Sequence, residues 1–135
     1  MPVKEIIPDL VFGPVTRTVL ALYAGASGDH NPIHIDSDFA RDAGQPDVFA
    51  QGMLSFGVLA RVVTEWAGQD RLRRFGVRFA SMVHVHDTVT CHGHVVERID
   101  HEGHLCLRVA VEAKTQNGHI ALSGEAIVED RDALR

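Results

Sequence analysis

The stretch Gly52-Met-Leu-Ser-Phe-Gly-Val-Leu-Ala-Arg-Val-Val-Thr-Glu-Trp-Ala67 decides the fold of this chain. It predicts one helix of 16 residues, and no charge occurs between Gly52 and Ala60. A helix that is apolar nearly all round is buried on most of its sides. It is too short to cross a bilayer, which takes roughly 20 apolar residues. The rest of the chain must therefore wrap around this helix.

The residues after the helix supply the wrapping. Apolar and polar side chains alternate there, as they do in half-buried strands. We expect strands over residues 74–83, 88–99, 105–114 and 120–128, with a turn at His101–Gly103 and a hairpin at Asn117-Gly118. These elements predict an α+β fold, in which an antiparallel sheet of about five strands curls around one long central helix.

The first half of the chain reads as helical and irregular. One helix is expected over 17–27, where Gly28 ends it. A shorter helix is expected over 37–43, with Asp36 as its N-cap and Gly44 as its stop. Because no linker, repeat or low-complexity tract interrupts the chain, residues 1–135 are predicted to form a single domain.

Composition excludes some classes of function. The formal net charge of −5 argues against nucleic acid as a partner, because phosphate backbones require a basic face. We expect no membrane partner and a cytoplasmic location, since the sequence contains neither a long apolar run nor a signal-peptide pattern. Cys91 and Cys106 are expected on neighbouring strands without a disulfide, with Cys106 opposite the region of Val96.

The segment Tyr23-Ala-Gly-Ala-Ser-Gly-Asp-His-Asn-Pro-Ile-His34 carries the chemistry. Its proline forces an extended or turn conformation on the preceding residue, Asn31. Such a turn can bring Asp29 and His34 towards a common point, where a carboxylate and an imidazole sharing one water form an acid–base unit. The alternative interpretation is that Asp29 caps the turn and His34 is a structural histidine.

The whole pattern resembles the signature of the R-specific enoyl-CoA hydratases and MaoC-like dehydratases. The resemblance rests on Tyr23, Ser27-Gly28-Asp29, Asn31-Pro32-Ile33-His34 and Ala40, and it continues through Ala50-Gln-Gly-Met-Leu-Ser-Phe-Gly57. It implies the hot-dog fold, in which a sheet wraps a long helix, and usually a homodimer. It also implies a lyase that hydrates trans-2-enoyl thioesters of coenzyme A or acyl carrier protein to (3R)-3-hydroxyacyl thioesters, without a cofactor.

The resemblance also implies roles for individual residues. Asp29 and His34 match the catalytic pair that binds the water, and Asn31 matches a position that shapes the loop. Gly52 matches the region whose backbone N–H binds the thioester carbonyl, as a helix N-terminus is able to do. Ser55, one turn further on, is expected to line the substrate site or to bond back to its own helix.

One position departs from the family pattern. The family usually has histidine before this glycine, and here the residue is Gln51. Glutamine both donates and accepts hydrogen bonds but carries no charge. We expect Gln51 at the substrate site, together with Asn31, Gly52 and Ser55. It can replace a histidine that only supports the loop by hydrogen bonds, but not one that tunes the pKa of Asp29 or His34.

Several alternatives remain open at this stage. The hot-dog fold also hosts thioesterases, and a non-catalytic thioester-binding subunit of a heterodimer would carry the same pattern. The pairs His84/His86 and His92/His94 invite a metal site, but no cysteine or carboxylate framework supports one, so we expect no metal. The cluster of Arg71, Arg73, Arg74 and Arg78 is either a solvated strand edge or a contact for phosphate or acidic carrier surfaces.

Overall fold

The structure, a computed structural model, describes residues 6–131. Its helices are α1 (Arg17–Ser27), α2 (Ser37–Asp42) and α3 (Gly52–Ala67), together with two 3₁₀ turns, η1 (Pro32–His34) and η2 (Gln69–Arg71). Its strands are β1 (Leu10–Phe12), β2 (Leu72–Phe79), β3 (Val89–His101), β4 (His104–Thr115) and β5 (Ile120–Glu129). The expected bounds of α1 and α3 are confirmed, and α2 ends one residue before the expected position.

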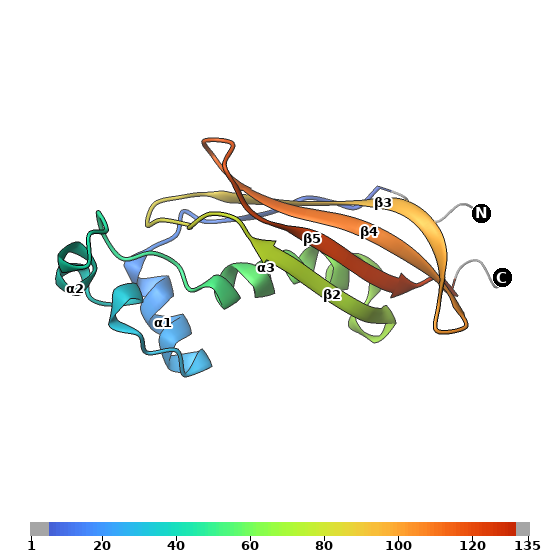
Figure 1. Cartoon of the computed structure of the whole chain (residues 1–135), viewed down its shortest axis with the longest axis horizontal. Helices are drawn as coiled ribbons and strands as arrows, with labels where there is room; N and C mark the ends of the chain where they lie inside the picture. The colour runs from blue at the N-terminus through green and yellow to red at the C-terminus, as the bar shows by residue number, and fades with distance from the viewer. Residues whose placement is uncertain (1–5, 132–135) are drawn as a thin grey trace.

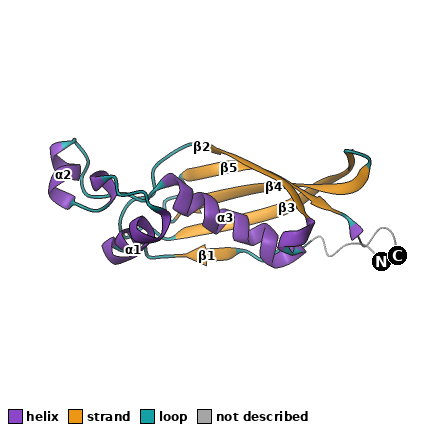
Figure 2. Cartoon of the chain, turned by 90° about the horizontal axis from the view of Figure 1, so that it is seen from below, coloured by secondary structure: helices purple, strands orange, loops and turns teal. Residues whose placement is uncertain are grey.

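The five strands form one antiparallel sheet in the order β1-β3-β4-β5-β2. The sheet curves over α3, which lies along its inner face (Figures 1 and 2). Helices α1 and α2 lie beyond the end of the sheet where α3 begins. The predicted arrangement, an antiparallel sheet around one long central helix, is confirmed.

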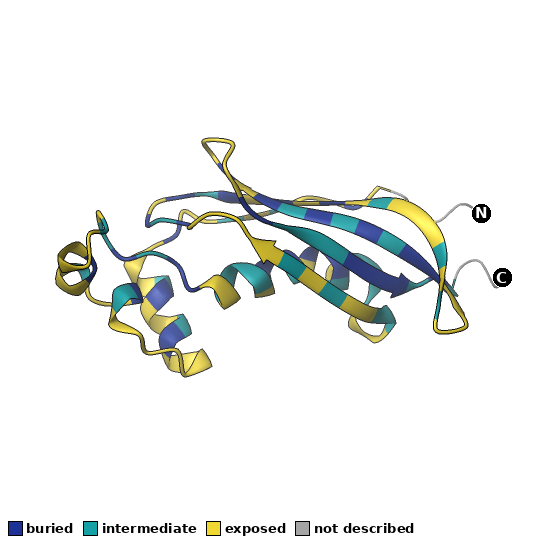
Figure 3. Ribbon diagram, in the orientation of Figure 1, coloured by how far each residue is buried: buried dark blue, intermediate teal, exposed yellow. Residues whose placement is uncertain are grey.

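Helix α3 provides much of the core. Val58, Leu59, Val62 and Val63 are buried against the sheet, and the ring of Phe56 meets that of Phe75 edge-to-face at 5.0 Å. Each such side chain contributes about 1.5–3 kcal/mol through the apolar surface it removes from water. Buried and partly buried positions alternate along β4 from Leu107 to Ala113, because successive side chains point to opposite faces of the sheet (Figure 3).

The strand expected over 74–83 is wrong at its end. Pairing with β5 stops at Phe79, and the backbone N–H groups of Ala80 and Ser81 both donate to the carbonyl of Ala121. The chain then leaves the sheet, and the carbonyl of Val83 accepts from the backbone N–H of Ala50 at 2.8 Å. Val83 is buried in a loop rather than in a strand, so its apolar character does not report strand pairing.

Two other expectations need correction. The turn between β3 and β4 is tight, with His101 opposite His104, so Cys106 lies opposite Ile99 and not in the region of Val96. Cys91 and Cys106 are both buried free thiols. Burial raises the pKa of the Cys91 thiol to about 11. The three-residue strand β1 was not predicted, because so short a segment shows no periodicity.

The histidine pairs do not assemble. His84 and His86 lie outside the strands, and His86 has a left-handed backbone conformation. His92 and His94 do share a strand, with ring centroids 5.8 Å apart, and Nδ1 of His92 lies 2.7 Å from a carboxylate oxygen of Asp9. Between residues 6 and 131, no three histidine, cysteine or carboxylate side chains are arranged to hold a metal ion. No helix in the same range is long and apolar enough to span a membrane.

Candidate active site

The loop between α1 and η1 positions the predicted acid–base pair. Gly28 ends α1 in the left-handed conformation, at φ 79°, which costs glycine little. The backbone N–H of Asp29 donates to the hydroxyl of Ser27 at 3.1 Å. The carboxamide oxygen of Asn31 accepts from the N–H of Ile33 at 3.2 Å and so caps η1, whose last residue is His34. Asn31 is thus the N-cap of η1 within this loop.

The imidazole of His34 is held in one orientation. Its Nδ1 lies 2.7 Å from the carbonyl oxygen of Phe49, and its ring meets the Phe49 ring edge-on at 5.0 Å. A carbonyl can only accept, so Nδ1 carries the hydrogen. In the neutral ring Nε2 then has a free lone pair, which can take up a proton. The residue is 9% exposed, so little of the ring is open to water.

Asp29 lies next to Nε2 of His34. One of its carboxylate oxygens lies 3.9 Å from Nε2 of His34, and its side chain is 46% exposed. The distance is too long for a direct hydrogen bond, but it leaves room for a water oxygen at ordinary hydrogen-bond distance from both groups. The structure thus brings the two predicted residues together in the geometry that a shared water requires.

A cavity of about 380 Å³ adjoins His34. Gly52 and Ser55 of α3 line it on one side, and Phe79, Met82, Val83 and Leu122 are among its apolar walls. Helix α3 has no side-chain N-cap, so its first N–H groups are left for another acceptor. A Cβ at Gly52 would lie 3.1 Å from the Phe79 ring, and glycine therefore lets this wall approach the helix N-terminus closely.

Gln51, expected at the substrate site, lies where the start of α3 meets α1. Its side chain is fully buried, and its amide nitrogen donates to the carbonyl oxygen of Leu20 in α1 at 3.0 Å. Its amide oxygen is buried without a hydrogen-bond partner. Gln51 does not line the 380 Å³ cavity; it joins the N-terminus of α3 to α1, the helix that leads into the Asp29 loop.

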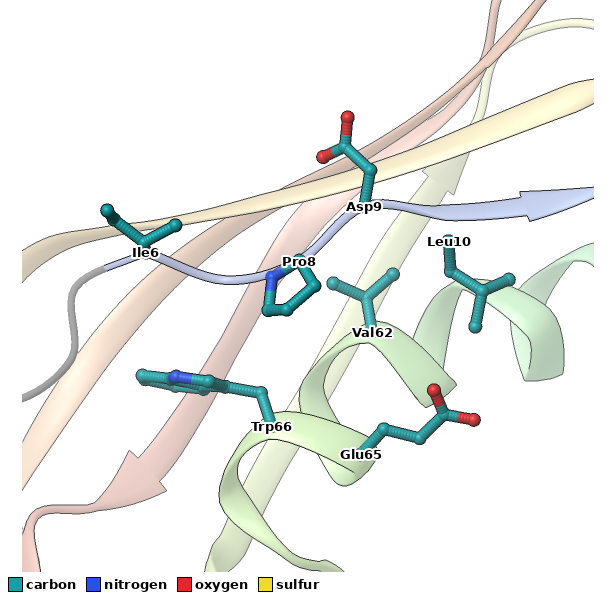
Figure 4. Close-up of a pocket in the computed structure, with 7 residues that line it drawn as sticks. All are labelled: Ile6, Pro8, Asp9, Leu10, Val62, Glu65 and Trp66. Carbon is teal, nitrogen blue, oxygen red and sulfur yellow. The ribbon is translucent and has the colours of Figure 1, made fainter.

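A second cavity, of about 470 Å³, lies between the N-terminal segment and the C-terminal half of α3 (Figure 4). Ile6, Pro8, Leu10, Val62 and Trp66 form most of its walls, and the carboxylate of Asp9 points away from it. None of the predicted site residues lines it. Although larger, it lacks an acid–base pair and a helix N-terminus, so the cavity beside His34 is the candidate active site.

The arginine cluster is divided in the structure. Arg73 contacts the carboxylate of Glu129 and the carbonyl of Asp70, which joins it to the end of β5. Arg74 and Arg78 are exposed on β2, and neither lines the candidate site. The sequence interpretation also missed the pocket walls, the Phe49 carbonyl and Asp47. A backbone carbonyl has no signature in a sequence, and wall residues depend on strand facing and loop paths.

Fold and site together define a class: a hot-dog protein with a His–Asp pair and a cavity at the uncapped N-terminus of its central helix. Comparison with known proteins gives the family. The model of the MaoC-like domain matches residues 10–117. The chain therefore belongs to the family of MaoC-like dehydratases, as its motif indicated.

Individual relatives agree with this placement. The beta subunit of 3-oxo-4,17-pregnadiene-20-carboxyl-CoA hydratase of Mycobacterium tuberculosis is 31% identical over 130 residues, which cover 95% of this chain and 97% of that protein. Fatty acid synthase subunit beta of Aspergillus oryzae is 40% identical over 119 residues, 82% of this chain but only 6% of that much longer protein. The R-hydratase of Pseudomonas aeruginosa has a TM-score of 0.77 at 26% identity, over 93% of this chain and 81% of the other.

Proposed function

We propose that this chain is a hydratase that reversibly adds water to trans-2-enoyl thioesters and gives (3R)-3-hydroxyacyl thioesters. The observation that carries the proposal is the His34–Asp29 pair, 3.9 Å apart, beside the uncapped N-terminus of α3. Similarity to a hydratase beta subunit and to an R-hydratase supports both the reaction and the 3R product. The apolar walls of the adjoining cavity suit an acyl chain.

The proposed reaction needs only groups of this chain and one water. Asp29 and Nε2 of His34 hold the water; as its oxygen bonds to C3, Nε2 takes one of its protons. The electrons of the C2–C3 double bond move towards the thioester carbonyl, and negative charge develops on the carbonyl oxygen. Backbone N–H groups at Gly52 and the α3 dipole stabilise that charge. The imidazolium then donates this proton to C2. The hydrogen and hydroxyl of one water are thus both added, and no cofactor takes part.

The substrate carrier and the assembly form part of the proposal. Acyl-CoA and acyl-carrier-protein thioesters present the same enoyl group to the site. The strands β1 and β2 are at the edges of the sheet, and proteins usually cover or pair such edges. We propose a homodimer. A heterodimer is the alternative, because the Mycobacterium tuberculosis relative is itself a beta subunit.

The test is a spectrophotometric hydration assay on enoyl-CoA substrates of increasing chain length, with chiral analysis of the product. Asp29→Asn and His34→Ala are each expected to lower turnover by about a hundredfold or more, the scale of a lost general acid or base. The double variant should be only slightly less active than the less active of the two single variants, because the two residues act as one unit. Near-normal turnover by either single variant would refute the assignment, and release of free thiol without hydration would identify a thioesterase.

Light scattering at assay concentration tests the assembly. A homodimer gives about twice the mass of the chain and full activity alone. Activity that appears only after a second, different subunit is added would establish the heterodimer instead.

A further inference from the structure

Asp47 lies outside the family motif, yet its carboxylate joins three parts of the molecule. One oxygen accepts from the hydroxyl of Ser37, the first residue of α2, at 2.7 Å, and from the backbone N–H of Val48 at 2.7 Å. The other forms an ion pair with Arg17 in the first turn of α1 and lies 3.5 Å from the guanidinium of Arg41. The residue was not singled out in the sequence, because an isolated aspartate before a strand-like tripeptide has no distinctive pattern.

These contacts join the segment that carries His34 to the segment that carries its hydrogen-bond partner, Phe49. On one side, Nδ1 donates to the carbonyl of Phe49. On the other, Ser37, three residues after His34, is bonded to Asp47, two residues before Phe49. Two short segments, 34–37 and 47–49, are thus joined at both ends, and the carboxylate oxygen that receives Ser37 also receives the N–H of Val48. The Phe49 carbonyl has little freedom to move relative to the ring.

We infer that Asp47 is a positioning residue, which fixes the orientation and tautomer of His34 through Ser37 and the Phe49 carbonyl. The inference rests on the proposed function only for its kinetic consequence; the effect on the imidazole is independent of it. A ring that loses its carbonyl partner can place hydrogen on Nε2, and that nitrogen then cannot accept a proton from water. A misplacement of about 1 Å at a reacting group is enough to reduce turnover a hundredfold.

Asp47 is suited to this task across the working pH range. Hydrogen bonds from Arg17, Ser37 and the N–H of Val48 hold the pKa of its carboxyl well below the usual range. The carboxylate of Asp47 therefore stays charged at neutral and mildly acidic pH, and its contacts with Ser37 and Arg17 do not titrate there.

The experiment compares Ser37→Ala, Asp47→Ala and the double variant with the wild type. A control, Asp70→Ala, loses the ion pair of Asp70 with Arg131, a contact of the same kind far from the cavity. Nitrogen–proton correlation spectra of the imidazoles report the tautomer of His34, which is assigned by its loss in His34→Ala. Hydration kinetics report kcat and KM on the same samples.

In the wild type we expect a single Nδ1–H tautomer for His34. In Asp47→Ala the two nitrogen shifts should move towards each other, kcat should fall about ten- to a hundredfold, and KM should change less than about twofold. Ser37→Ala should give a smaller change of the same kind, and the double variant should match Asp47→Ala, because both substitutions break one link. Asp70→Ala should lower only the melting temperature.

The tautomer measurement separates this inference from the proposed function. An inactive wild type with a shifted tautomer in Asp47→Ala would refute the hydratase proposal and support the positioning role of Asp47. Unchanged His34 nitrogen shifts in both Ser37→Ala and Asp47→Ala would overturn the inference, whatever the kinetics. So would an Nε2–H tautomer in the wild type.

Discussion

Replacement of Gln51 by methionine tests whether this residue supports the fold or acts on the substrate. The side chain is fully buried, donates one hydrogen bond to Leu20 and leaves its amide oxygen without a partner. Methionine has about the same length and no group that needs a partner. Gln51→Met therefore removes one neutral hydrogen bond and one unsatisfied buried acceptor at the same time.

The two effects oppose each other. Loss of the bond to Leu20 costs about 0.5–1.5 kcal/mol, and removal of the unsatisfied oxygen gains about 1–3 kcal/mol. We expect the free energy of unfolding of Gln51→Met to change by between about −0.5 and +2.5 kcal/mol. For a chain of this length that corresponds to a change in melting temperature of between about −2 and +9 °C. Gln51→Ala leaves a cavity between α1 and α3, and should lower the free energy of unfolding by about 2–4 kcal/mol.

The assay is thermal unfolding at one fixed protein concentration, because melting temperatures of oligomers depend on concentration. Hydration kinetics on the same samples complete the test, and turnover of Gln51→Met should stay within about threefold of the wild type if the residue only supports the site. A Gln51→Met protein as unstable as Gln51→Ala would show that the amide is fully satisfied in the folded state. A stable Gln51→Met protein that has lost turnover would show that Gln51 takes part in the reaction.

Three further predictions concern Gly52, the exposed arginines of β2 and the carboxylate of Asp47. Gly52→Ala should raise KM severalfold by displacing the Phe79 ring from the cavity wall, whereas Gly57→Ala, whose added Cβ meets nothing within 4 Å, should leave KM unchanged and stabilise α3 by up to about 1 kcal/mol. Arg74→Ala combined with Arg78→Ala should raise KM for acyl-CoA but not for a pantetheine thioester, and the effect should shrink at high salt. If KM for acyl-CoA stays at the wild-type value, these arginines are solvated surface residues without a role in binding. Because Arg17 lowers the pKa of Asp47 in the folded state, this carboxylate stabilises the protein above the unfolded pKa of about 4, and the contribution is lost as pH falls below it. Melting temperature should therefore drop more steeply between about pH 5 and pH 3 in the wild type than in Asp47→Asn.

The sequence by itself determined the elements that depend on local patterns. The uncharged run after Gln51 predicted the bounds of α3, and a helix of this length that is apolar on nearly every side must be buried in the core. Alternation along β4 and the Asn117-Gly118 turn determined the hairpin with β5. The motif from Tyr23 to His34 identified the candidate acid–base pair through its resemblance to a family signature, and its glycine, asparagine and proline predicted the turn.

Only the tertiary structure decided how these parts meet. The strand expected over 74–83 ends at Phe79, where the N–H groups of Ala80 and Ser81 both donate to the carbonyl of Ala121 in β5. The tautomer of His34 depends on the carbonyl of Phe49, and that carbonyl depends on Asp47, Ser37 and Arg17 from three separate segments. Gln51 donates to the carbonyl of Leu20 in α1 and does not line the cavity. Such long-range hydrogen bonds join ordinary backbone groups and isolated polar side chains, which leave no periodic signal in a sequence.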